Sequence, residues 1–241
     1  MTIVTQPPPA HQPPQRTRTR LLIAAMVAIV VAVFAVAIAA AVDDDSSSRA
    51  ERGSGVAVTE DRNVSSFTSV EVAGDNDVMI HVGSPPSVAV TADDNLVDRV
   101  TTTVRDGRLV IDNVGSFTTT AAMQVVVSVP SLDEVELSGT GSVTISGVSE
   151  DEFVATLSGT GTLTASGTAA RLTARLVGSG MLVLQDLVAG DVTAQLEGTG
   201  EIRVHATSTL DATLTGTGTI HYAGEPAVTS HNTGTGSITP A

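Results

Sequence analysis

A tripeptide, Gly-Thr-Gly or Gly-Ser-Gly, occurs six times between residues 139 and 236, and it restricts the possible folds more than any other feature. Its first glycines follow one another at intervals of 20, 19, 20, 18 and 18 residues. A repeat of about 20 residues or more is typical of solenoids, in which each repeat packs only on its neighbours. The glycines of the repeat are Gly139, Gly141, Gly159, Gly161, Gly178, Gly180, Gly198, Gly200, Gly216, Gly218, Gly234 and Gly236.

Apolar and polar residues alternate on both sides of each tripeptide. Phe153, Ala155 and Leu157 precede the second tripeptide, for example, and Leu163 and Ala165 follow it. A period of two predicts strands with one buried face. We therefore predict an all-β domain, a right-handed parallel β-helix in which each coil is strand, glycine corner, strand and turn. Stacking at ~4.8 Å places like residues over like residues.

The two glycines of each corner are expected to be structural. A bend favours positive φ values, which residues with a Cβ resist, and corners stacked at ~4.8 Å leave little room for side chains. An earlier, divergent copy at residues 70–80 aligns with residues 135–145 and puts Asn76 where Gly141 lies. Asparagine tolerates the left-handed conformation. The Thr and Ser residues between the glycines should form a row of hydroxyls along one edge.

The two ends of the repeat array differ from its middle. Between the divergent copy and the first tripeptide, Asp106-Gly107 predicts a hairpin within longer N-terminal coils. At the other end, the inward positions Val228, Ser230 and Asn232 become polar. This change predicts a terminal cap, as repeat arrays need, and leaves open the alternative that the last strand pairs with another subunit.

A second constraint is an uncharged run of 22 residues, 21–42, which as a helix would span about 33 Å and could cross a bilayer core of about 30 Å. Arg16, Arg18 and Arg20 precede it, and three aspartates follow it, which predicts a cytoplasmic N-terminus. We predict a cytoplasmic proline-rich tail (1–20), a transmembrane signal anchor (21–42), a flexible linker (43–55) and an extracytoplasmic domain (56–241). Small residues at 37–41 leave a cleaved signal peptide as the alternative.

Composition and charge exclude several functions. The absence of cysteine excludes a disulfide framework, a zinc–thiolate site and a thiol nucleophile. All 26 acidic residues but only nine arginines lie beyond residue 42, a formal charge of −17 that disfavours nucleic acid as a partner. The Gly-x-Gly corners lack the third glycine of a dinucleotide loop and the aspartate of calcium-binding repeats. We expect no cofactor and no metal site.

The corner segments Leu-Ser-Gly-Thr-Gly-Ser-Val (137–143) and Leu-Ser-Gly-Thr-Gly-Thr-Leu (157–163) resemble a known family, as do the spacing of Phe67, Val70, Val72 and Gly74 and the segment at 94–96. From about residue 65 to residue 238 the chain is similar to the head GIN domain of auto-transporter adhesins (DUF2807). This resemblance implies a right-handed parallel β-helix and a role in cell adhesion without recognised catalytic residues, the role being an analogy at the level of the fold.

Outward positions after the corners are mostly Thr and Ser, and the charged exceptions are the best candidate binding site: Glu201, Arg203 and His221, with His205 nearby. With one Tyr, four Phe and no Trp in the chain, stacking on carbohydrate is disfavoured. We predict a non-enzymatic module whose partners are the membrane and a surface protein or envelope component. The alternatives are a degenerate polysaccharide-active enzyme using Glu201, Arg203 and His221, and a sensory or structural envelope domain.

Overall fold

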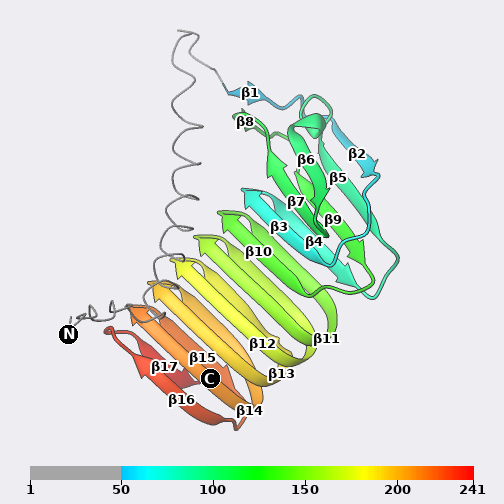
Figure 1. Ribbon diagram of the computed structural model, residues 1–241. Coiled ribbons are helices and arrows are strands. Elements are labelled where there is room, and N and C mark those ends of the chain that lie inside the picture. The colour runs from blue at the N-terminus through cyan, green and yellow to red at the C-terminus, as the bar shows by residue number, and fades with distance from the viewer. Residues whose placement is uncertain (1–49) are drawn as a thin grey trace, which may run out of the picture. The chain divides into compact units, whose positions relative to one another are not determined.

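The computed structural model describes residues 50–241, which consist mainly of stacked strands (Figure 1). Within these residues the one helical element is a 3₁₀ turn, η1 (Val97–Arg99). The strands are β1 (Glu51–Arg52), β2 (Ala57–Arg62), β3 (Ser69–Gly74), β4 (Asp77–Val82), β5 (Ser87–Asp93), β6 (Val100–Arg105), β7 (Arg108–Asn113), β8 (Phe117–Thr118), β9 (Gln124–Val129), β10 (Glu134–Gly139), β11 (Ser142–Gly159), β12 (Thr162–Gly178), β13 (Met181–Gly198), β14 (Glu201–Gly216), β15 (Thr219–Ala223), β16 (Ala227–Asn232) and β17 (Ser237–Pro240).

The four longest strands, β11 to β14, each carry the chain through one coil, from one glycine corner to the next (Figure 1). Neighbouring coils pair in parallel, and their corners lie in register: Gly139 with Gly159, then Gly178, Gly198 and Gly216. The result is a β-solenoid of about five turns. The predicted parallel stack of coils is confirmed.

The core consists of columns of aliphatic side chains that run along the stack. Because side chains alternate along a strand, every second residue points inward and meets its register partner in the next coil. In one such column, five leucines in successive coils are fully buried: Leu137, Leu157, Leu176, Leu196 and Leu214. Each leucine is covered only because the neighbouring coil supplies another, so a single coil would leave its apolar side in water.

The two glycines of a corner differ in backbone conformation but share a lack of space. The first glycine has a positive φ in five of the six tripeptides, from 128° at Gly216 to 144° at Gly139. The second glycine has no positive φ, but a Cβ on Gly200 would overlap the carbonyl oxygen of Gly180 in the preceding coil. The expected positive φ therefore holds only for the first glycine, whereas the expected lack of space holds for both, since a Cβ on Gly159 would also overlap the carbonyl oxygen of Gly139.

Asn76 occupies the expected corner position but not the expected conformation. The N–H of Ser142 donates to its carbonyl oxygen at 3.2 Å, which places Asn76 one coil before Gly141. Among residues 50–241, however, Asp106 is the only non-glycine residue with a positive φ, at 51°. Asn76 is instead buried, and its Nδ2 donates to the carbonyl oxygen of Ala73 at 3.0 Å. The predicted register was correct and the predicted left-handed backbone was wrong.

The N-terminal end of the stack is closed by antiparallel strands. β3 and β4 form the first corner and pair in parallel with β10 and β11. Beyond them, β7 pairs with β3, and β6 folds back on β7 through a turn at Asp106 and Gly107, so the predicted hairpin is confirmed. On the other face, β9 pairs with β4, and β5 runs antiparallel between β9 and β2.

The folded domain begins before residue 56. β1 pairs with β8, the N–H of Gly53 donates to the Thr118 carbonyl oxygen at 2.8 Å, and the N–H of Gly55 donates to the Asp93 carboxylate at 2.6 Å. Residues 51–55 thus belong to the domain rather than to the predicted linker. The predicted tail (1–20) and transmembrane helix (21–42) lie outside the described residues. Within residues 50–241, no helix has the length and apolar character needed to span a bilayer.

The last coil consists of β16 and β17, which pair in parallel with β14 and β15. Every residue of β16 is exposed, including the inward positions Val228, Ser230 and Asn232. The side chain of Asn232 accepts a hydrogen bond from the N–H of Gly234 at 2.9 Å and donates to the carbonyl oxygen of Gly236 at 2.8 Å. Asn232, one of the polar inward residues of the last coil, therefore closes the final corner.

Candidate functional site

The four predicted site residues lie on the outer side of two neighbouring coils. Glu201, Arg203 and His205 alternate in β14 with the buried Ile202 and Val204. Because side chains alternate along a strand, the three polar residues project outward. β15 follows the next corner and pairs with β14 in parallel, so its outward residues lie beside them.

Three of these residues are in contact. Arg203 and His221 are register partners, and Nε of Arg203 donates to Oε1 of Glu201 at 2.6 Å. Nε2 of His221 lies 3.7 Å from the same carboxylate oxygen, and its Nδ1 lies 3.1 Å from Oγ1 of Thr239. His205 is the register partner of Ala223 and makes no ion pair among residues 50–241. The structure thus brings together Glu201, Arg203 and His221, whereas His205 takes no part in the ion pairs of this cluster.

This cluster is open to water. The side chains of Glu201, Arg203 and His221 are 26%, 41% and 36% exposed. Exposed ion pairs contribute about 0–1 kcal/mol to stability, because water and salt screen the charges. The main effect of the Glu201–Arg203 pair is therefore to hold the guanidinium in one direction.

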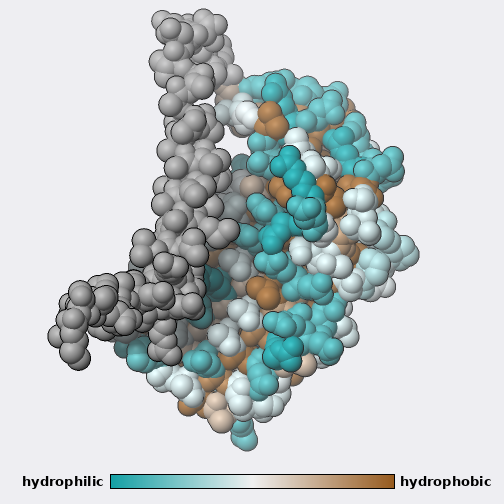
Figure 2. Space-filling view, viewed as in Figure 1, coloured by the Kyte–Doolittle hydropathy of each residue, from teal (hydrophilic) through white to brown (hydrophobic). Residues whose placement is uncertain are grey.

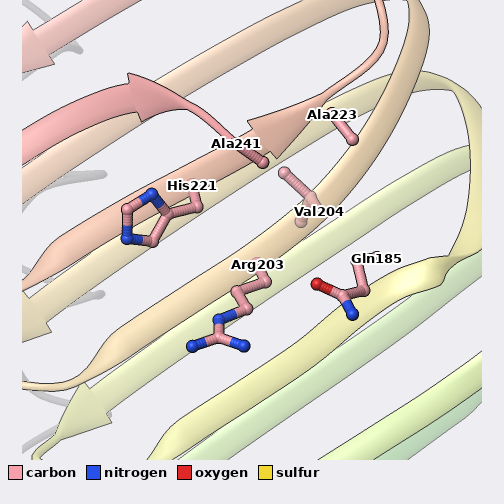
Figure 3. A pocket seen from close by; sticks show the side chains of 6 residues that line it. All are labelled: Gln185, Arg203, Val204, His221, Ala223 and Ala241. Atoms are coloured by element: carbon pink, nitrogen blue, oxygen red, sulfur yellow. The ribbon is translucent and has the colours of Figure 1, made fainter.

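A hollow of about 250 Å³ lies beside Arg203 and His221 and is also lined by Gln185, Val204, Ala223 and Ala241. Gln185, Arg203 and His221 come from three successive coils (Figure 3). Sequence reasoning missed Gln185, which lies where the pairing of β13 with β14 shifts between Leu184 and Val188. The sequence did contain a sign of this shift: the corners at 178 and 198 are 20 residues apart, whereas the next two corners are 18 residues apart.

The described side chains that line the hollow offer hydrogen-bond donors but no carboxylate. The side chains of Arg203, Gln185 and His221 can all donate to an oxygen-rich group. None of the described side chains that line it carries a carboxylate, and Glu201 is engaged by Arg203. Glycoside hydrolysis generally needs two carboxyl groups roughly 5–10 Å apart. In residues 50–241, no three acidic or histidine side chains are grouped so that they could hold a metal ion.

A second hollow, of about 530 Å³, is acidic and was not predicted. Two arginines neutralise part of its charge: Arg171 lies 3.3 Å from Glu152, and Arg108 lies 2.7 Å from Glu134. The acidic run at residues 150–152 could have been recognised in the sequence as part of such a site. The residues of other strands that complete the hollow could not. The residues that line the hollow are Ser69, Asp133, Glu134, Glu150, Asp151, Glu152, Val154 and Arg171.

The corner hydroxyls form an exposed row, as predicted, but not a hydrogen-bonded chain. In the described part of the chain, Ser179 and Thr199 are the one pair of these hydroxyls within hydrogen-bond distance, at 2.8 Å. With Thr160 they line a shallow hollow of about 280 Å³. On the face shown in Figure 2, hydrophobic residues are interspersed with hydrophilic ones.

One buried carboxylate, Asp93, has a structural role. It is fully buried and accepts hydrogen bonds from the N–H groups of Gly55 at 2.6 Å, Thr120 at 3.0 Å and Ala121 at 3.2 Å. The Thr120 N–H, with those of Gly55 and Ala121, holds the pKa of Asp93 below its ordinary value, although burial acts in the opposite direction. Asp93 thereby joins residues 53–55 to the rest of the domain.

The corner repeat, the parallel coils and the closed N-terminal end together define a β-solenoid domain. The family model described as putative auto-transporter adhesin, head GIN domain, matches residues 66–226. The chain belongs to this family, as the sequence resemblance suggested. No curated protein matches the chain.

Solved structures share the fold. A putative adhesin from Bacteroides fragilis is 23% identical, with a TM-score of 0.65, and the match covers 79% of this chain and 99% of that one. A putative lipid binding protein from Parabacteroides distasonis is 24% identical, with a TM-score of 0.52, and the match covers 80% and 100%. A putative adhesin from Parabacteroides merdae is 21% identical, with a TM-score of 0.51, and the match covers 79% and 98%. At these identities the likeness concerns the fold alone.

Proposed function

We propose that the protein is a single-pass membrane protein with a cytoplasmic N-terminus, whose right-handed solenoid acts outside the membrane as a non-enzymatic adhesion or envelope-binding module. The uncharged run at residues 21–42, with arginines before it and aspartates after it, supports the anchor and its orientation. Membership of a family described as an adhesin supports the role of the solenoid.

The observation that carries the proposal is the hollow beside Arg203. Arg203 and His221 offer it hydrogen-bond donors from two coils that backbone pairing holds in register, and Gln185 adds a donor from the coil before them, where the pairing shifts. A site fixed in this way loses little conformational freedom when it binds, which favours affinity. A carbonyl, carboxylate or hydroxyl group of a surface protein or envelope component fits these donors.

The enzymatic alternative has less support. A polysaccharide-active enzyme would need Glu201 as an acid or base, but this carboxylate is paired with Arg203 at 2.6 Å and does not line the hollow. Its test is direct: the wild-type chain and Glu201→Gln are incubated with envelope glycans, and released sugar is measured. Release by the wild type and not by Glu201→Gln would establish the enzyme.

The adhesion proposal is tested with the full chain reconstituted in fluorescent liposomes and added to cells or envelope fragments. Arg203→Gln should lower retention several-fold, because it removes the guanidinium from the hollow. Arg175→Gln is the matched control, since Arg175 is also half-exposed and paired with a glutamate, Glu197, but lies away from the hollow. No retention of the wild type would refute the function, whereas equal retention of both variants would refute only the site.

A further inference from the structure

The two ends of the solenoid are closed to different degrees. At the N-terminal end, Leu109 and Ile111 of β7 are fully buried, and β6 pairs beyond them. At the C-terminal end, Val228 is 41% exposed, although Leu210 and Val192, which precede it in the same core column, are 1% and 2% exposed. The column therefore ends on an apolar side chain that no described residue covers.

The strands at the two ends also differ in charge. β2 and β16 are both six residues long, both begin with Ala-Val-Thr, and each pairs on one side only within residues 50–241. β2 continues with Glu60, Asp61 and Arg62, and charged side chains on an edge strand oppose pairing with another chain. β16 continues with Ser-His-Asn, and residues 226–241 contain no Asp, Glu, Lys or Arg. The edge of β16 lacks this protection.

We infer that two copies of this chain join end to end through their last coils. A second copy is the partner that fits, because it presents the same edge of β16, unpaired within residues 50–241, and the same uncovered Val228. The part of the chain beyond residue 42 has a formal charge of −17, so most of its surface repels a copy of itself. The uncharged last coil, β16 and β17 at the lower end of the stack in Figure 1, is the region where that repulsion is weakest.

The geometry of this contact follows from symmetry. A two-fold axis places β16 of one copy antiparallel to β16 of the other, so that the free N–H and C=O groups of both edges pair. Val228 of each copy then covers the exposed end of the other copy's core column. Because the contact uses the same surface on both copies, it closes at two subunits and does not continue into a fibre.

The chain contains no cysteine, which allows a clean crosslinking test. Thr229 is an outward residue of β16, paired with Asp211, and Thr173 is an outward residue of β12 near the middle of the stack. Thr229→Cys in the full chain, in membranes, should give a product of twice the chain mass with a short bismaleimide. Thr173→Cys is the control and should give none. Labelling with a single maleimide checks that both thiols are accessible.

A second variant tests the edge itself. Thr229→Lys combined with His231→Lys puts charged side chains on the edge of β16, as β2 has on its own edge, and Thr229 lies beside Asp211, so the fold should keep its melting temperature. The detergent-solubilised wild type should have the protein mass of a dimer by light scattering, and the variant that of a monomer. A monomeric wild type, a dimeric lysine variant, or equal crosslinking of both cysteines would overturn the inference.

Discussion

Gly159 lies directly over Gly139, its register partner in the preceding coil, and a Cβ on Gly159 would overlap the Gly139 carbonyl oxygen. That oxygen accepts hydrogen bonds from the N–H groups of Thr160 and Gly161, both at 3.1 Å. Each corner is thus bound to the one before it by backbone atoms that a side chain would displace. The glycines recur in the sequence at intervals of one coil because each corner makes this contact with the corner before it.

Gly200→Ala should destabilise the domain by about 1–3 kcal/mol, the usual cost of overpacking. Gly200 has no positive φ, so alanine meets no backbone strain there, and the loss would report the overlap with Gly180 and with the side chain of Leu176. A thermal melt followed by circular dichroism measures it. Thr217→Ala, at an exposed corner position, should stay within about 0.5 kcal/mol. Equal melting of Gly200→Ala and the wild type would contradict the steric role.

The solenoid could be predicted from sequence because the residue patterns that determine it are short and recur in every coil. The alternation around Leu157 defines an inner face, the tripeptide defines a corner, and five intervals of nearly equal length define the stack. The grouping of Glu201, Arg203 and His221 followed from the same alignment, since register partners in successive coils occupy equivalent positions.

Features that depend on departures from the repeat could not be predicted. Gln185 reaches the hollow because the pairing of β13 with β14 shifts, and this shift accommodates the greater length of the coil that contains β13. The repeat does not show at which position of the coil the additional residues lie. Asn76 belongs to the first corner, so the steric limit that acts on Gly141 from an earlier corner does not act on it. The contacts of Asp93 join segments 27 and 38 residues apart that share no motif.

Asp93→Asn should weaken the attachment of residues 51–55. In the folded protein the pKa of Asp93 is lowered by the Thr120, Gly55 and Ala121 N–H donors. A carboxyl with a lowered folded pKa stabilises the fold above its unfolded pKa, about 3.9, and this stabilisation is lost as pH falls through the folded value. The wild type should therefore lose stability in acid over that window, and Asp93→Asn should show less of this loss while being less stable near neutral pH.

Hydrogen exchange of the Gly55 and Thr120 amides, with urea titrations from neutral pH to pH 3, measures both effects. Asp94→Asn is the control: the neighbouring carboxylate is exposed and bonds the hydroxyl of Ser54 instead of several backbone amides. An Asp93→Asn variant with wild-type protection and the same acid dependence would show that the buried carboxylate does not stabilise this attachment.

Phe153→Ala should cost about 3–5 kcal/mol, because a large side chain with no exposed surface is removed from a packed column. Phe153→Leu should cost much less, since Leu172 already occupies the equivalent place in the next coil. Urea unfolding of both variants gives the comparison. A small loss for alanine would mean that the coils relax into the vacated space and would argue against a rigid stack.

Arg108→Gln should destabilise the fold more than Arg203→Gln does. Arg108 lies 2.7 Å from Glu134, 3.2 Å from Glu136 and 3.8 Å from Glu71, and the last two glutamates are register partners in adjacent strands. Without the guanidinium these like charges repel one another across neighbouring strands. Arg203 pairs with a single glutamate, Glu201, and its own side chain is 41% exposed, so its loss should cost about 1 kcal/mol or less.

Salt distinguishes this repulsion from a loss of packing. Added salt screens exposed charges, so Arg108→Gln should recover part of its stability at high ionic strength, whereas Arg203→Gln should change little. Urea titrations of both variants at low and at high salt test this difference. If Arg108→Gln were equally destabilised at both ionic strengths, the packing of the arginine stem over the strands, rather than its charge, would account for its role.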